Sequence, residues 1–432
     1  MELALKRPRG RRLRTIFWTF LATAFAVVLV ANLSLGDKHI DEDVPTLYSV
    51  SDAQFLRNMN VMLGPGVLPG NRIEALLNGD QIFPAMLDAI RAARRSITFE
   101  TYIYWSGDVG EQFTRALIER AQAGVKVHVL FDAVGSQKID EQIIRRMKDA
   151  GMEVVKYNPL RWYTLARMNN RSHRKILVVD GEVGFTGGVG IADEWSGNAQ
   201  DENHWRDTHF RLEGPVVAQM QAAFMENWIE VTGQVLHGEA YFPPLRETGR
   251  ELAQFFISSP GGGGESMQLM YLMSIAAATR TIRLSAAYFV PDDNEVRMLV
   301  DAQRRGVKVQ IIAPGAITDS PAVRRASRST WGELLRAGVE IYEYQPTFYH
   351  CKVMIVDDLW VSVGSTNFDT RSFSVNDEAN LNVYDREFAL AQVRIFEEDL
   401  RRSRRISLEE WEKRPWTEKA WERTMGLLSS QL

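Results

Sequence analysis

Helical stretches and apolar runs alternate along most of the chain. From Pro84 the sequence PAMLDAIRAARRS has apolar residues at helical spacing, and the apolar run ITFETYIYW follows it. A second helical stretch ends at Gly124, directly before the run VKVHVLFD. Apolar residues three or four apart predict helices that bury one face, and short apolar runs predict buried strands. The alternation predicts an α/β fold whose mostly parallel sheets are flanked by helices.

The same order of segments occurs again in the second part of the chain. TIRLSAAYFVP matches ITFETYIYW, GVKVQIIAPG matches GVKVHVLFD, and AGVEIYEYQP matches AGMEVVKYNP. An internal repeat of this length indicates two similar structural units. We therefore predict two halves, residues 76–245 and 246–402, which are related by a pseudo-twofold axis and form one composite site at their interface.

A polar motif stands at the same place in both halves. Each copy has a His, one residue, a Lys, four residues and an Asp, and an apolar run lies between the Lys and the Asp. Residues two apart on a strand point to the same side, so each His shares a face with its Lys. Each Asp lies an odd number of positions from both, where a hairpin turn is predicted. Because the motif recurs in two diverged halves, we interpret its members as candidate catalytic residues: His173, Lys175, Asp180, His350, Lys352 and Asp357.

The double HxKxxxxD motif, followed in the second copy by GSTN, resembles the phospholipase D superfamily. The phrases FETYIYW, FTGGVGIADEW, HWRDTHFRLEGP and VGSTNFDTRSFSVNDEANL are similar to those of bacterial cardiolipin synthases and close phospholipase D-like relatives. The resemblance extends from about Gly79 to about Arg402. It implies a pseudo-twofold phospholipase D-like fold and a phosphatidyltransferase that needs no cofactor. The sequence also has no His, Cys or acidic cluster with the spacing of metal ligands.

The motif residues match the needs of phosphodiester chemistry without a metal. Such an enzyme must supply positive charge, a nucleophile and a proton for the leaving oxygen. Two His and two Lys provide this set, and an imidazole pKa of about 6.5 allows neutral and protonated rings to coexist near neutrality. The resemblance implies that His173 attacks phosphorus to form a phosphohistidine and that His350 is the general acid. Nothing in the sequence itself distinguishes the two histidines.

The two copies differ after the motif. The second copy has Ser365 and Asn367, which we expect to bind phosphate beside His350. The first copy has Gly188 and Gly190 at the matching places, and these offer only backbone N–H groups to an anion. The composite site is therefore expected to be asymmetric.

Two acidic residues are implied as partners of the histidine rings. Glu378 follows His350 by 28 positions, and Asp207 occupies the matching place after His173. A carboxylate that accepts a hydrogen bond from one ring nitrogen fixes the orientation of the other. The resemblance implies that Asp207 and Glu378 have this role, whereas the alternative is that both are exposed loop acids.

The N-terminal part of the chain predicts a membrane anchor. Residues 1–14 contain six basic residues and one acidic residue, and residues 15–36 contain no charge. An apolar segment of this length is sufficient for a bilayer-spanning helix, and the basic flank is expected on the cytoplasmic side. We predict an uncleaved signal anchor rather than a cleaved signal peptide. The catalytic body then lies outside the cytoplasm, on a single-pass protein of the bacterial inner membrane.

Three further segments lie outside the two repeated cores. Residues 37–75 are predicted to be a linker with a short helix. The loop at 160–172 is an insertion of the first half, rich in basic and aromatic residues, which either contacts lipid or packs as a lid. The basic, Trp-containing tail at 403–432 either rests on the membrane surface or packs back on the second half.

Charge and cysteine content narrow the classes of function. The chain has 432 residues and a formal net charge of −4, so removal of the basic tail leaves a body with about −9. A nucleic acid usually selects a basic surface, so no nucleic acid partner is expected. Cys351 is the single cysteine of the chain, which excludes an internal disulfide framework.

The predicted function is transfer of a phosphatidyl group between two phosphatidylglycerol molecules, with release of glycerol. The partners are then the phospholipid substrate and the bilayer. A phospholipase D that uses water as acceptor and forms phosphatidic acid would employ the same residues. An extracytoplasmic nuclease of the same superfamily would require a basic groove. A membrane scaffold without activity would not require two intact His-Lys pairs.

Overall fold

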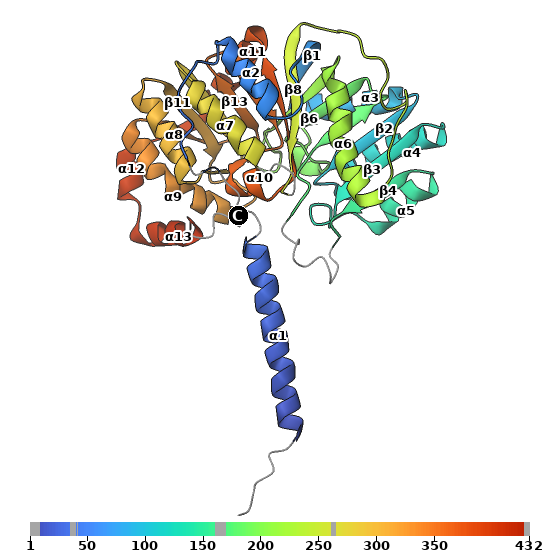
Figure 1. The fold of residues 1–432 in the computed structure, drawn as a ribbon, viewed down its shortest axis with the longest axis horizontal. Helices are drawn as coiled ribbons and strands as arrows, with labels where there is room; N and C mark the ends of the chain where they lie inside the picture. Colours follow the sequence, from blue (N-terminus) through green and yellow to red (C-terminus); the bar gives the residue numbers. More distant parts are fainter. Residues whose placement is uncertain (1–8, 35–39, 41, 160–169, 261–264, 427–432) are drawn as a thin grey trace, which may run out of the picture.

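The computed structural model describes residues 9–34, 40, 42–159, 170–260 and 265–426, which form a large α/β body with one long protruding helix (Figure 1). The body is built on one continuous 15-stranded sheet. Its strand order is β17-β12-β11-β9-β13-β14-β16-β8-β1-β7-β6-β5-β2-β3-β4.

The sheet is arranged symmetrically about the antiparallel pair β1–β8 at its centre. Outward from β1 and from β8, six strands of one half match six strands of the other in position and chain order, and β17 is an additional edge strand. The first half contains β1 (Leu68–Leu77), β2 (Ser96–Thr101), β3 (Lys126–Asp132), β4 (Glu153–Tyr157), β5 (Ile176–Val179), β6 (Val183–Gly187) and β7 (Thr208–Glu213). The second contains β8 (Glu251–Ser258), β9 (Thr281–Ala286), β11 (Lys308–Pro314), β12 (Glu340–Tyr344), β13 (Lys352–Val356), β14 (Trp360–Gly364), β16 (Glu378–Tyr384) and β17 (Ser403–Ile406).

The prediction of mostly parallel sheets is wrong, because the sheet is mixed. Parallel pairing within it is confined to β2-β3-β4 and to β9-β11-β12, and its remaining neighbours are antiparallel. The predicted hairpins are confirmed: β5–β6 and β13–β14 are antiparallel pairs. Their turns have left-handed backbone at Asp180 (φ 54°), Gly181 (φ 69°), Asp357 (φ 52°) and Asp358 (φ 54°). An apolar run predicts that a strand is buried but does not indicate whether the strand is parallel or antiparallel to its neighbours. For this reason the sequence pattern overestimated the parallel part of the sheet.

Helices cover both faces of the sheet (Figure 1). One hydrophobic core belongs to the first half and one to the second, whereas a third joins the halves. In this shared core, Trp228 of α6 and Phe396 of α11 are buried, and Phe210 packs against Phe388 at 6.1 Å between ring centroids. The helices are α2 (Ala53–Met62), α3 (Asn78–Ala92), α4 (Asp108–Gln122), α5 (Glu141–Asp149), α6 (Val216–Thr232), α7 (Glu265–Ala277), α8 (Asp293–Arg304), α9 (Pro321–Ala337), α10 (Thr370–Ser374) and α11 (Arg386–Arg401).

Two short elements lie near the junction of the halves. The 3-10 helix η2 (Asp193–Trp195) follows β6, and the two-stranded parallel sheet of β10 (Phe289–Val290) and β15 (Phe368–Asp369) lies outside the large sheet. The predicted linker contains α2 and most of β1, so the central sheet begins inside that range.

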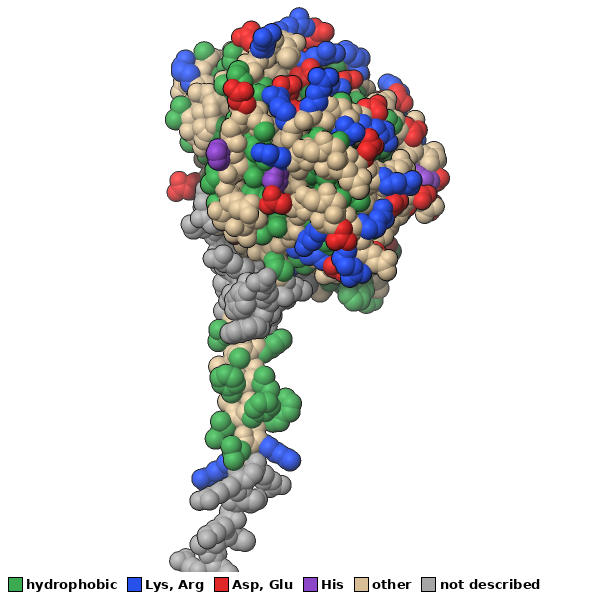
Figure 2. Space-filling model, turned by 90° about the vertical axis from the view of Figure 1, so that its right-hand side faces the viewer, with side chains coloured by type: hydrophobic (Ala, Val, Ile, Leu, Met, Phe, Trp, Pro, Cys, Tyr) green, Lys and Arg blue, Asp and Glu red, His purple; other side chains and the backbone are tan. Residues whose placement is uncertain are grey.

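The protruding helix is α1 (Arg9–Ser34). Figure 2 shows hydrophobic side chains along it, and Ile16, Trp18, Phe20 and Phe25 are each at least 67% exposed. Among the residues that the structure describes, however, no helix has the length and apolarity needed to cross a membrane, so the span predicted for residues 15–36 is not supported by the structure.

The C-terminal tail packs on the second half. Strand β17 pairs with β12, and α12 (Leu408–Lys413) and α13 (Trp416–Gly426) lie against α9. The Trp411 indole donates to the carbonyl of Arg328 at 3.0 Å, and the buried Glu422 accepts from Arg328 at 2.9 Å and from Arg414 at 2.6 Å. Of the two alternatives for the tail, the structure shows the packed one. The inserted loop, by contrast, lies largely outside the described residues.

Candidate active site

The two His-Lys motifs meet where the halves join. His173 lies just before β5 and His350 just before β13, and both are buried. Each is fixed by the opposite half: the His173 N–H donates to the Asp377 carbonyl at 2.9 Å, and the His350 N–H donates to the Arg206 carbonyl at 2.8 Å. These backbone bonds place the ends of both motif strands on one cavity.

Each histidine contacts the acidic residue of the opposite half. His173 Nδ1 lies 3.0 Å and 3.1 Å from the carboxylate oxygens of Glu378, and His350 Nδ1 lies 2.6 Å from Oδ2 of Asp207. Both acids are fully buried, and the histidines hold the pKa of each carboxyl below its usual range despite burial. A charged carboxylate can only accept, so each Nδ1 carries a proton and Nε2 is the nitrogen left for other partners. Spacing within each half did not reveal this exchange.

The two lysines lie beside their histidines, as the strand pattern predicts. Lys175 Nζ donates to the His173 carbonyl at 2.7 Å, and Lys352 Nζ donates to the His350 carbonyl at 2.8 Å. Lys352 Nζ also lies 3.1 Å from His350 Nε2, whereas no such contact is present at His173 among the described atoms. The two half-sites are therefore electrostatically different.

Burial lowers the pKa values of both histidines and both lysines and so favours their neutral forms. It lowers the pKa of His173 to about 4 and that of His350 to about 3, against the opposing effect of the carboxylates. It also lowers the pKa of Lys175 to about 7, with a further contribution from Lys352, whose own pKa is lowered by burial. An anion that enters the cavity favours the protonated forms of these groups and so opposes the effect of burial.

The motif aspartates, which the sequence predicts as catalytic residues, are not among the residues that line this cavity. Asp180 accepts from the backbone N–H groups of Arg94, Arg95 and Ser96 at 2.7–3.1 Å. Asp357 has the equivalent role before β9, accepting from the N–H groups of residues 279–281 at 2.7–2.8 Å. Each carboxylate joins its hairpin turn to the start of the neighbouring strand. The odd spacing from His and Lys was the signal for this structural role.

Ser365, which the sequence predicts to bind phosphate, is likewise not among the residues that line the cavity. Its hydroxyl donates to Oε2 of Glu378 at 2.5 Å and accepts from the Ala379 N–H at 2.9 Å. It therefore supports the acid that orients His173 rather than facing a phosphate. Asn367, by contrast, lines the cavity, and its buried Oδ1 has no hydrogen-bond partner among the described atoms.

Trp195 has the same role for Asp207 that Ser365 has for Glu378: its side chain donates a hydrogen bond to the carboxylate. Its indole N–H donates to Oδ2 of Asp207 at 2.8 Å. A Cβ added at Gly188 would lie 2.2 Å from Asp207 Oδ1, and one added at Gly190 would lie 2.8 Å from Ile103 Cβ and 3.2 Å from the Trp195 ring. The glycines thus make room for the acid and the indole. The phrase ADEW was part of the family resemblance, but it gave no indication of this role.

Aromatic rings surround His350. Trp195, Trp205 and Phe348 have ring centroids 5.3 Å, 5.7 Å and 5.4 Å from the imidazole. Tyr102 is placed in the same way beside His173, at 5.2 Å. These rings exclude water from the histidines, which explains their depressed pKa values.

The cavity between the motifs has a volume of about 130 Å³ and is lined by both halves. Both histidines, Lys175 and Asn367 are among its lining residues. The sequence reasoning missed several others, which come from loops far apart in the chain: Tyr102, Arg171, Trp205, Tyr288, Asp319, Arg371 and Asn376.

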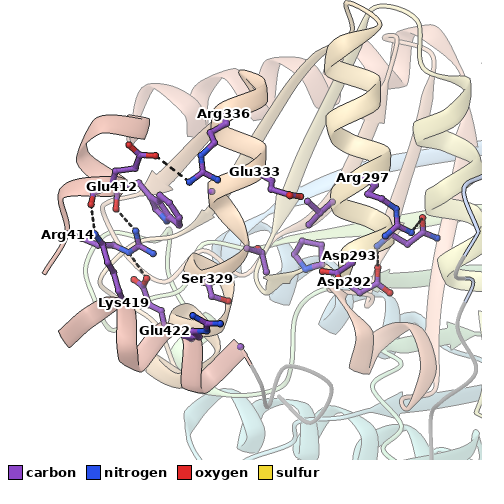
Figure 3. A pocket seen from close by; sticks show the side chains of 18 residues that line it. Asp292, Asp293, Arg297, Ser329, Glu333, Arg336, Glu412, Arg414, Lys419 and Glu422 are labelled. Carbon is purple, nitrogen blue, oxygen red and sulfur yellow. Dashed lines mark hydrogen bonds and ion pairs between the residues drawn. The ribbon is translucent and has the colours of Figure 1, made fainter. Parts of the chain in front are cut away.

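A larger cavity of about 1120 Å³ lies elsewhere, between α8, α9 and the C-terminal helices (Figure 3). Two ion pairs join charged side chains of its lining, Arg336–Glu412 and Arg414–Glu422. It contains no histidine, so we do not assign the chemistry to it. In the described part of the chain, no group of three or more His, Cys, Asp or Glu side chains is arranged to hold a metal ion.

A two-half sheet with a His-Lys pair from each half at one cavity defines a protein of the phospholipase D class. The family described as "Cardiolipin synthase, PLD-like domain" matches residues 86–228 and 271–400, and the chain belongs to this family. It is a phosphatidyltransferase of the cardiolipin synthase type.

Similar proteins agree with this placement. The chain is 37% identical over 360 residues to cardiolipin synthase of Geobacillus kaustophilus, a match that covers 83% of this chain and 72% of that protein. It is 38% identical over 339 residues to a probable cardiolipin synthase of Bacillus subtilis, with coverage of 78% and 67%. The crystal structure of phosphatidylserine synthase from Haemophilus influenzae has the same fold, with a TM-score of 0.64, 14% identity, and coverage of 88% of this chain and 99% of that one.

Proposed function

We propose that the cavity transfers a phosphatidyl group from one phosphatidylglycerol to another through a phosphohistidine on His173. The observation that carries this proposal is the pair of imidazoles on one cavity, each oriented at Nδ1 by a carboxylate of the opposite half. Orientation at Nδ1 leaves Nε2 for phosphorus on one ring and for a proton on the other.

In the first displacement, His173 Nε2 attacks phosphorus of the donor. A P–N bond forms, the P–O bond to the glycerol headgroup breaks, and His350 gives its Nε2 proton to the leaving oxygen. The choice of His173 as nucleophile is supported by Lys352, which lies 3.1 Å from Nε2 of His350 and competes for its lone pair. His173 has no comparable competitor among the described atoms.

His350 must be protonated when it acts as the acid, although its pKa in the free protein is lowered to about 3. The bound phosphodiester supplies a negative charge directly beside it. An anion near an imidazole favours the protonated form, so substrate binding raises this pKa. Asn367 and the two lysines would hold the phosphate oxygens during the step.

In the second displacement, the terminal hydroxyl of another phosphatidylglycerol attacks the phosphohistidine. His350 accepts the hydroxyl proton, a new P–O bond forms, and the P–N bond to His173 breaks. The products are cardiolipin and the free enzyme. Two displacements retain the configuration at phosphorus.

The test is incubation of the purified protein with labelled phosphatidylglycerol in detergent, followed by lipid chromatography. We expect cardiolipin and glycerol as products. Phosphatidic acid as the main product would show that water is the acceptor and would contradict transfer. The acidic body, with about −9 charge, argues against a nuclease, which would need a basic groove.

We also propose that residues 15–36 anchor the protein in the inner membrane with the body outside the cytoplasm. The support is the uncharged sequence of this segment and the six basic residues that precede it. Alkaline phosphatase fused after Leu432 should be active, and green fluorescent protein at the same place should be dark. The reverse pattern would contradict this orientation.

A further inference from the structure

Two acidic residues, Asp319 and Asp369, line the active-site cavity. Asp369 is buried and serves as the N-cap of α10, where its carboxylate accepts from the Ser372 N–H at 2.7 Å. Asp319 lies in the loop after β11, at an exposed position. A negative charge on the wall repels the phosphate of an anionic lipid, so phosphate binding gives Asp319 no role. A carboxylate is, however, a strong acceptor for hydroxyl groups.

Tyr288 connects Asp319 to the side of the cavity that contains His350. Strands β9 and β13 are antiparallel, with Ala286 opposite Lys352. Continuation of this register places Tyr288 opposite His350, and both residues line the cavity. The Tyr288 hydroxyl donates to Oδ2 of Asp319 at 2.7 Å. The carboxylate therefore lies on the wall near the imidazole to which the proposed mechanism assigns proton transfer.

The Asp319 carboxylate keeps acceptor capacity for a ligand. Among the described residues, Tyr288 is the one side chain that donates a hydrogen bond to it, and no Lys, Arg or His side chain forms an ion pair with it. Partial burial raises the pKa of Asp319, whereas the Tyr288 hydroxyl and the nearby charge of Lys352 oppose this rise. A carboxylate has about four lone-pair sites, so one hydroxyl partner leaves room for another.

A second acceptor on the same side of the cavity has no partner. Oδ1 of Asn367 is buried and unpaired among the described atoms, and the N–H of the next residue, Phe368, donates to the Tyr288 carbonyl at 3.0 Å. An amide has a donor NH₂ group and an acceptor oxygen. An ionised phosphate can satisfy only the NH₂ group. The Asn367 oxygen and the Asp319 carboxylate therefore both suit a ligand that donates hydrogen bonds.

Glycerol is the group that occupies this side of the cavity in the proposed reaction. His350 protonates the oxygen that leaves in the first displacement, and it accepts the proton of the hydroxyl that attacks in the second. Both oxygens belong to glycerol units. In each unit a central hydroxyl stands on the carbon next to the one that bears the reacting oxygen, and it is free to donate. The cavity is small, about 130 Å³, so this hydroxyl lies close to the wall.

We propose that Asp319 accepts a hydrogen bond from the central hydroxyl of glycerol and so selects glycerol headgroups over alcohols that lack this hydroxyl. Tyr288 is a positioning residue, because its hydroxyl holds the carboxylate. The inference rests on the proposed function and names the headgroup determinant of the same site. Asp319 takes no part in proton transfer, so its loss should change which substrate is used rather than the chemical steps.

The experiment uses an equimolar mixture of two lipids in detergent, phosphatidylglycerol and phosphatidyl-1,3-propanediol. Their headgroups both end in a primary hydroxyl and differ only in the central hydroxyl. The initial rates of glycerol and propanediol release, measured by mass spectrometry, give the ratio of kcat/KM for the two donors. Because both lipids compete for the same enzyme, this ratio does not depend on the amount of active protein.

We expect the wild type to prefer phosphatidylglycerol and Asp319→Ala to lower the ratio roughly tenfold to a hundredfold, the value of a hydrogen bond to a charged group. Asp319→Asn should lower it less, because the amide oxygen still accepts but carries no charge. Tyr288→Phe should also lower it, because the carboxylate loses the hydroxyl that holds it. These two variants test the proposal even if Asp319→Ala does not fold.

The control is Glu333→Gln, which removes a negative charge from an exposed position of α9 outside this cavity. It should leave the ratio unchanged. A wild type without preference for phosphatidylglycerol overturns the proposal. An unchanged ratio in the Asp319 variants does so as well, even if both rates fall, since an equal fall shows that Asp319 only supports the structure. Failure of the proposed function is distinct, because the wild type would then form no cardiolipin from phosphatidylglycerol alone.

Discussion

His173 Nδ1 lies 3.0 Å from the carboxylate of Glu378, a residue 205 positions later in the chain and in the other half of the sheet. The reciprocal contact joins His350 to Asp207 at 2.6 Å. Neither half therefore contains a complete histidine–carboxylate pair. Because each pair crosses the interface, both the orientation of the rings and the activity depend on the docking of the two halves.

The two histidines should be separable with a donor whose leaving group needs no proton. His173→Ala should abolish turnover of both phosphatidylglycerol and a phosphatidyl p-nitrophenol ester. His350→Ala should abolish turnover of phosphatidylglycerol but still release p-nitrophenol in a single burst, because only the leaving-group proton is lost. Absorbance of p-nitrophenol measures the burst. A burst in His173→Ala instead would exchange the two roles.

Substitution of each acidic residue should affect the step that depends on the histidine it contacts, so Asp207 should act with His350 and Glu378 with His173. Asp207→Asn should behave like His350→Ala in a milder form, and its first step should be restored by the p-nitrophenol ester. Glu378→Gln should slow that step with either donor, because it disturbs the nucleophile. Loss of such an orienting carboxylate lowers kcat by on the order of 10²–10⁴-fold. If the p-nitrophenol ester restored the first step of Glu378→Gln but not that of Asp207→Asn, the assignment of each acid to the histidine of the other half would be wrong.

Asp180→Ala should affect stability rather than chemistry. Its carboxylate accepts three backbone N–H groups between the hairpin turn and β2, and leaving such groups unpaired costs about 1–3 kcal/mol. We expect a lower Tm and a kcat close to wild type for the folded fraction. The control is Glu182→Ala, at an exposed position of the same turn. A kcat reduced as much as in His173→Ala would return Asp180 to the catalytic set.

Asn367 and Ser365 should respond differently to substitution. Asn367→Ala removes a side chain from the cavity, and loss of one hydrogen bond to a charged phosphate should lower kcat roughly tenfold to a hundredfold. Ser365→Ala should act through Glu378 and therefore slow formation of the phosphohistidine. Quenched-flow measurement of that intermediate distinguishes the two variants. Wild-type rates in Asn367→Ala would show that GSTN is a structural turn.

The buried histidines should make the protein less stable in mild acid. Below about pH 6.5 the unfolded chain binds protons at histidine, whereas His173, with its pKa lowered to about 4, stays neutral in the folded protein. The free energy of unfolding thus falls as the pH drops from about 6.5 to about 4, by roughly 2 kcal/mol per such residue at pH 5. His173→Gln should lose less stability between pH 7 and pH 5 than wild type. Denaturant unfolding at both pH values measures this, and equal losses would contradict it.

The sequence alone determined the features that depend on local pattern. Strand alternation placed each His and Lys on one face, and the repeat of segments indicated two similar halves. The odd spacing of Asp180 and Asp357 also contained the information that they face away from the site, although the recurrence of the motif suggested otherwise. Burial and periodicity are properties of short segments, so they can be inferred from neighbouring residues.

Only the tertiary structure decided which segments meet. The tertiary structure sets the strand directions, and it pairs Asp207 and Glu378 with the histidines of the opposite halves. It also gives Trp195 the role at Asp207 that Ser365 has at Glu378, and it brings Arg171 and Arg371 to one cavity. Each of these features depends on residues that are distant in the chain. The number of residues between a histidine and the acid of its own half does not depend on which of the two histidines that acid contacts. The spacing therefore cannot show which pairs form. The pairing is set by how the two halves dock across β1 and β8, which no local pattern encodes.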